Sequence, residues 1–137
     1  MFILLLPVVI FITGCSEKTV VECVCTPFPS GDTTILKVGH KQILYDCCKD
    51  KFALTPEAVD DSRCPLQFQC VWAGTAHIKL RINQLFGEII SIELNHSKTF
   101  DYNNHTYTIK FINLSPYPVD GYPGQEDYEA AIIVSRE

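Results

Sequence analysis

The most reactive side chains of this chain belong to its seven cysteines. A thiol can be acylated, oxidised to a disulfide, or bound to a metal ion as a thiolate. Their spacing is uneven, with two close pairs and three isolated positions: Cys15, Cys23, Cys25, Cys47, Cys48, Cys64 and Cys70. The chemistry open to them depends on the compartment, which the N-terminal segment indicates.

Cys15 ends a short apolar segment. Residues 1–14 contain no charged side chain, and polar residues begin at Ser16, too early for the roughly 20 apolar residues of a membrane-spanning helix. The segment closes with Ile12-Thr-Gly-Cys15, which has the form of a bacterial lipobox. We therefore predict that residues 1–14 are a lipoprotein signal peptide, and that Cys15 becomes the N-terminus carrying diacylglycerol and fatty acyl chains such as palmitate.

This prediction places the protein in the bacterial cell envelope, with the membrane as a partner through the lipid. An ordinary secretory signal and a retained anchor stay open, because no Lys or Arg precedes the apolar residues. Ser16 stands where Asp would favour retention at the inner membrane. In a Gram-negative host, the outer membrane is therefore the expected destination.

The six remaining cysteines are expected to form disulfides. An even number of thiols in an oxidising compartment is typical of them, and Cys64 and Cys70 lie in one short loop. By elimination, the other four would pair between their two sites, Cys23 and Cys25 with Cys47 and Cys48. A four-thiolate metal site usually needs C-x-x-C spacing, which these four lack, so we expect no metal and no cofactor. Thiol redox chemistry at Cys47-Cys48 is the remaining alternative.

Composition and patterning predict one domain without a nucleic-acid partner. The net charge is −5 and the eleven basic residues are scattered, whereas binding to a phosphate backbone needs clustered Lys and Arg. We expect a lipidated tether over residues 15–32 and a single domain over residues 33–137.

Within that domain, apolar and polar residues alternate in short segments. The clearest is Thr75–Asn83, with Ile78, Leu80 and Ile82 on one face. The other strand-like segments are Thr33–Val38, Lys41–Tyr45, Phe52–Leu54, Gly87–Asn95, Phe100–Tyr102, Thr106–Leu114 and Tyr128–Ser135. The pattern predicts an all-β fold, an antiparallel sandwich or barrel of about seven to eight short strands stapled by disulfides. Thr55–Asp60 is the one segment that favours a helix.

Three short motifs occur in a fixed order: Asp61-Ser-Arg-Cys-Pro65, Cys70-Val-Trp-Ala-Gly74 and Leu114-Ser-Pro-Tyr-Pro118. Together they resemble a family of small secreted and lipid-anchored bacterial proteins, over roughly residues 35–135. The resemblance implies no particular activity. It does not extend to the other four cysteines of the mature chain, so it does not support their pairing.

The first two motifs have a structural and a functional interpretation. In the structural one, Arg63 pairs with Asp60, Asp61 or a carboxylate further along the chain, and Trp72 plugs or covers the core. In the functional one, the stapled loop is a recognition surface with Arg63 and Trp72 as its anchors. Tyr117 and Tyr122, in a proline-rich segment, either belong to a connecting loop or form a stacking platform for a sugar or peptide.

The case for catalysis is weak. The four histidines share no metal-binding or catalytic spacing, and no nucleophile is paired with a base. We therefore expect a non-catalytic binding or structural module of the envelope, with Arg63, Trp72, Tyr117 and Tyr122 as candidate contacts for an envelope protein or glycan. An inhibitor of an envelope hydrolase, or a hydrolase itself, is the alternative.

Overall fold

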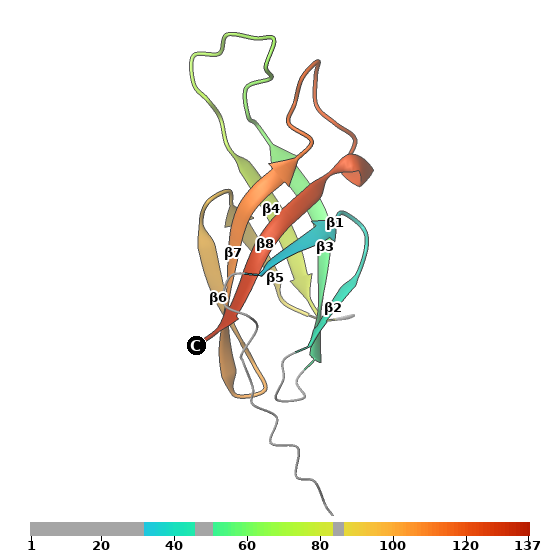
Figure 1. The fold of residues 1–137 in the computed structure, drawn as a ribbon, viewed down its shortest axis with the longest axis vertical. Coiled ribbons are helices and arrows are strands. Elements are labelled where there is room, and N and C mark those ends of the chain that lie inside the picture. Colours follow the sequence, from blue (N-terminus) through green and yellow to red (C-terminus); the bar gives the residue numbers. More distant parts are fainter. Residues whose placement is uncertain (1–31, 46–50, 84–86) are drawn as a thin grey trace, which may run out of the picture.

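The domain is a sandwich of two four-stranded antiparallel sheets (Figure 1). The computed structural model describes residues 32–45, 51–83 and 87–137. Within them lie eight strands and one 3-10 turn, η1 (Gln125–Asp127): β1 (Thr33–Lys37), β2 (Gln42–Tyr45), β3 (Lys51–Asp61), β4 (Ala76–Ile82), β5 (Ile89–Glu93), β6 (Ser97–Tyr102), β7 (His105–Ser115) and β8 (Glu129–Arg136). The predicted all-β sandwich is confirmed, and the sheets do not close into a barrel.

The strand order explains how the two sheets are connected. One sheet has the order β1-β8-β7-β6 and the other β2-β3-β4-β5. The chain therefore crosses between the sheets after β1 and again after β5, while β3, β4 and β5 follow one another as simple antiparallel neighbours.

The core lies between the sheets and follows the predicted alternation. Ile78, Leu80 and Ile82 of β4 are all buried, as are Ala130 and Ile132 of β8. Burial of an isoleucine or leucine side chain contributes roughly 1.5–3 kcal/mol, so the inward faces account for the pairing register. A cluster of aromatic rings fills one end of this core: Phe52, Phe100, Tyr102 and Tyr107.

The helix expected over Thr55–Asp60 is wrong, because β3 runs without interruption to Asp61. Pro56 cannot donate a backbone hydrogen bond. It lies beyond Leu54, the last residue of β3 that pairs with β2. The register with β4 shifts between Pro56 and Ala58. A bulge in a partly unpaired part of a strand is a position where proline is tolerated.

Two tight turns between strands are formed by residues with a positive φ. Asn103 and Asn104 join β6 to β7 with φ of 48° and 63°, the left-handed conformation that a tight two-residue hairpin turn requires. Gly39, with φ of 79°, turns the chain after β1, where the N–H of His40 donates to the carbonyl of Lys37.

Two long connections project from the same end of the sandwich. The last paired residues at this end are Asp61 with Ala76 and Ser115 with Glu129. The loop of residues 62–75 and the loop of residues 116–124, which leads into η1, extend beyond them side by side (Figure 1). We call these the first and second tip loops, and the surface they form the tip.

Candidate binding surface

A buried arginine joins the two tip loops. Arg63 is only 5% exposed, and its guanidinium binds the Asp61 carboxylate through two hydrogen bonds, Nε to Oδ1 at 2.8 Å and Nη2 to Oδ2 at 2.7 Å. The same group donates to the carbonyls of Leu114 at 2.9 Å and Pro116 at 3.2 Å, where the second tip loop begins. One side chain thus fixes the first tip loop to the start of the second.

Three tyrosines complete this arrangement. The ring of Tyr117 lies 4.6 Å from the Arg63 guanidinium carbon, a cation–π distance. The hydroxyl of Tyr122 donates to the Arg63 carbonyl at 3.2 Å, and that of Tyr128 donates to the Asp61 carboxylate at 3.0 Å. These partners of Arg63 are all internal to the domain, as the structural interpretation of the motif expects.

The electrostatics of this cluster favour a charged Asp61–Arg63 pair and a neutral Tyr128. Burial by itself would raise the pKa of Asp61, but the hydrogen bonds from Arg63 and Tyr128 outweigh it and hold the pKa below its ordinary value. Burial likewise opposes the charge on Arg63, and the carboxylate beside it raises the pKa of the guanidinium. Burial and the bond to Asp61 together raise the pKa of the Tyr128 hydroxyl far above its usual range.

The first tip loop is held by the predicted disulfide, since Cys64 and Cys70 are joined. Backbone hydrogen bonds extend the β3–β4 pairing into its base, where Ser62 donates to Thr75 and Cys64 donates to Ala73, both at 2.8 Å. Farther out, the N–H of Leu66 donates to the carbonyl of Pro118 at 3.1 Å. The two loops are thus also bonded directly to each other.

Apolar side chains gather on the outer surface of these loops. Of the eleven exposed large hydrophobic residues in the described part of the chain, seven lie on the tip: Leu66, Phe68, Val71, Trp72, Tyr117, Val119 and Tyr122. Val71 is fully exposed and Trp72 is 82% exposed. The expectation that Trp72 plugs or covers the core is therefore wrong, because Arg63 and Tyr128 occupy that end of the sandwich.

The tip also carries little charge. Residues 64–74 contain no charged side chain, and residues 116–125 contain one, the exposed Asp120. Leu66, Phe68, Val71 and Val119 were not predicted as surface residues. Their signal was present in the sequence, as apolar residues inside a disulfide loop and a proline-rich loop, where no strand could bury them.

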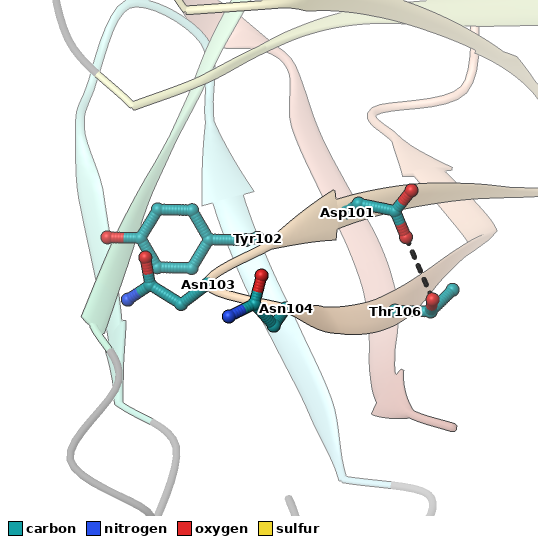
Figure 2. A pocket seen from close by; sticks show the side chains of 5 residues that line it. All are labelled: Asp101, Tyr102, Asn103, Asn104 and Thr106. Carbon is teal, nitrogen blue, oxygen red and sulfur yellow. Dashed lines mark hydrogen bonds between the residues drawn. The ribbon is translucent and has the colours of Figure 1, made fainter.

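Two shallow hollows lie away from the tip. One, of about 540 Å³, surrounds the β6–β7 turn (Figure 2), where the Thr106 hydroxyl donates to Asp101 at 2.8 Å. The side chains of Asn103 and Asn104 project from that turn (Figure 2). The other, of about 280 Å³, lies beside β2 and β3 and includes Lys41, Lys51 and Asn83. Neither lining contains a histidine or a pair of carboxylates.

Several predicted residues lie outside the described residues: Cys15, Cys23, Cys25, Cys47 and Cys48. In the part of the chain that the structure describes, no group of three His, Cys, Asp or Glu side chains is placed to hold a metal ion. Within the same residues, no helix has the length and apolar character needed to cross a membrane.

Comparison of the chain with protein-family models, with curated proteins and with solved structures found no match. The resemblance carried by the three motifs therefore stays a prediction.

Proposed function

We propose that this protein is a lipid-anchored module of the bacterial envelope that binds a partner, without catalysis, through its tip. The observation that carries the proposal is the concentration of exposed apolar side chains on two loops that are bonded to each other. Monomeric proteins rarely expose such clusters unless the cluster has an interaction role.

The construction of the loops supports binding over a purely structural role. A connecting loop needs neither a buried arginine that joins it to its neighbour nor outward-facing tryptophan and tyrosine. Loops that are ordered before contact lose less conformational entropy on binding, and Trp and Tyr are enriched among the residues that dominate binding energy.

The proposal is tested by removing the most exposed aromatic ring. Intact cells are treated with a crosslinker that requires neither amines nor thiols. We expect the wild-type protein to form a discrete complex that Trp72→Ser abolishes. Ile89→Ser is the matched control, because Ile89 is half exposed on β5 at the opposite end of the sandwich. Equal complex formation by both folded variants would contradict the proposal.

Inhibition of an envelope hydrolase is a second candidate, favoured by the way both loops project beyond the sheets (Figure 1). A rigid projecting loop suits entry into an active-site cleft. Adding purified protein to envelope extracts that degrade labelled casein or labelled peptidoglycan should then slow one of these reactions. Trp72→Ser should lose the effect.

A further inference from the structure

We infer that the tip inserts as a rigid wedge into an apolar cleft of a partner protein, with a basic side chain of that partner at the rim of the cleft facing Asp120. This inference rests on the proposed function and specifies the class of partner. Three features carry it: the outward direction of the apolar side chains, the rigidity of the loops, and the distribution of charge.

The apolar side chains project outward. Leu66, Phe68 and Val71 belong to the first tip loop and are well exposed, and the loop itself extends past the last paired residues of β3 and β4. A convex apolar surface is complementary to a concave one. Together, the seven exposed residues offer an area on the order of the ~800 Å² that a standard interface buries on each partner.

The rigidity of the loops favours a protein over a fluid bilayer. The disulfide, the bond from Leu66 to Pro118 and the contacts of Arg63 fix the loops in one relative position. A bilayer adapts to any apolar shape, so insertion into lipid does not depend on the particular shape that this order fixes. A protein cleft has a fixed shape, and preordered loops then raise the affinity.

The charges of the tip point in the same direction. Proteins that insert apolar side chains into membranes usually surround them with Lys or Arg facing anionic headgroups. Neither residues 64–74 nor residues 116–125 contain an exposed cation, and the one exposed charge is Asp120. Asp120 beside the apolar surface, with the exposed Glu126 and Asp127 of η1 following in the chain, suits a partner with an apolar cleft and a basic rim.

The first experiment identifies what the tip touches. Val71 is replaced by the photoreactive residue p-benzoylphenylalanine in the full-length protein, and Ile89 is replaced in the same way as the matched control. After irradiation of intact cells, we expect a discrete protein adduct from position 71, absent from position 89 and lost when Trp72→Ser is added to the position-71 variant.

The second experiment uses the captured partner, purified, with the full-length protein in detergent. We expect Trp72→Ser to weaken binding at least tenfold and Ile89→Ser to leave it unchanged. Asp120→Asn should weaken binding severalfold and reduce its dependence on salt, because a charge at the rim acts mainly through long-range attraction.

The outcomes separate this inference from the proposed function. A lipid or glycan adduct from position 71, with no protein adduct, would overturn the inference and leave the tip as the contact surface. No adduct specific to position 71 would overturn both. A protein that binds wild type and Trp72→Ser equally would overturn the inference, because the wedge would then not be the part that binds.

Discussion

At the scale of single residues, Arg63 shows that one side chain can shape a surface without being part of it. Its charge is buried against Asp61, with side-chain exposures of 7% and 2%. Taking two charges out of water is costly, and a buried pair is often no more stabilising than apolar residues of the same size. The pair instead holds the loops in position, because the guanidinium of Arg63 also donates to the carbonyls of Leu114 and Pro116.

Removing Arg63 alone should therefore be severe. We expect Arg63→Met to lower the free energy of unfolding by about 3–5 kcal/mol, because it leaves the Asp61 carboxylate buried without its partner. Urea denaturation followed by far-UV circular dichroism measures the change. Lys79→Met is the control, since its pair with Asp60 is solvent-exposed and worth about 1 kcal/mol or less.

If Arg63→Met does not fold, the double variant Asp61→Leu with Arg63→Met keeps the prediction testable. Removing both charges removes the unpaired carboxylate, so this variant should be more stable than Arg63→Met alone. Similar losses from Arg63→Met and Lys79→Met would show that the buried pair is unimportant.

The same cluster predicts how stability depends on pH. The pKa of Asp61 is lower in the folded protein than its ordinary value of 3.8. The folded state therefore binds its proton less readily than the unfolded state does. The contribution of the ionised Asp61 carboxylate to stability is complete above about pH 5. It is lost as the pH falls through about 4 toward the folded-state pKa of Asp61.

Asp61→Asn should accordingly flatten the loss of stability between about pH 5 and 3, measured as urea midpoints at a series of pH values. It should also be less stable at pH 7, because an amide cannot replace a carboxylate that accepts two bonds from Arg63. Asp101→Asn, at the exposed turn of Figure 2, is the control and should keep the acid transition.

At the residue scale, the local sequence does not decide which side chains are buried. Arg63 and Trp72 are both candidate anchors by residue type, yet the structure buries the first and exposes the second. Both types occur at interfaces and in cores, and their burial depends on what else fills the end of the sandwich. Tyr128 fills it, through a bond to Asp61 over a separation of 67 residues that no local pattern reveals.

At the scale of elements, the period-two pattern identifies every strand at least in part, with β3 recognised only over Phe52–Leu54. Inward positions of β4 and β8 are buried as their alternation predicts. The helix predicted over Thr55–Asp60 is wrong. It is expected from the sequence because Pro followed by Glu and Ala is typical of the first turn of a helix. The decisive fact is that β2 stops pairing with β3 at Leu54, which a single sequence does not disclose.

Gly74 is the element-scale position where a side chain cannot be accommodated. Its φ is 69°, and a Cβ atom would lie 1.8 Å from the carbonyl oxygen of Ser62. Gly121 also has a positive φ, 90°, with nothing within 4 Å of the added atom. An added Cβ atom would therefore clash at Gly74 and not at Gly121, whereas at both positions a residue with a Cβ atom would have to adopt an unfavourable left-handed backbone conformation.

We therefore expect Gly74→Ala to destabilise the domain more than Gly121→Ala, by a further ~1–3 kcal/mol, the usual range for overpacking. Gly121→Ala should cost only the roughly 1–2 kcal/mol of a left-handed residue with a Cβ atom. Thermal and urea unfolding of both variants measure the difference. Equal losses would mean that the base of the first tip loop yields without strain.

At the scale of the whole molecule, the proposed anchor and the tip act at different places on the chain. β1 begins beside Ile133, near the middle of β8, and runs toward the tip end. If Cys15 is lipidated, about 16 residues separate it from Asp32, a reach of roughly 55 Å at full extension. This length sets the greatest distance between the domain and the membrane surface, and the predicted disulfides of Cys23 and Cys25 would shorten it.

Lipidation itself is directly measurable. We expect the intact mass of membrane-extracted protein to correspond to Cys15 onward plus acyl chains, and Cys15→Ser to leave the membrane fraction. Alkylation before and after reduction should show no free thiol in the native protein. An unmodified mass, or thiols at Cys47 and Cys48 that react without reduction, would contradict the prediction and favour redox chemistry there.

The position of Trp72 makes this protein convenient for spectroscopy. It is the one tryptophan in the whole sequence, and in the folded domain its indole already faces water. Unfolding should therefore change the wavelength of its emission very little, whereas contact with another molecule should shift the emission to the blue. Unlabelled protein thus carries a fluorophore that reports occupancy of the tip and is nearly silent about the integrity of the core.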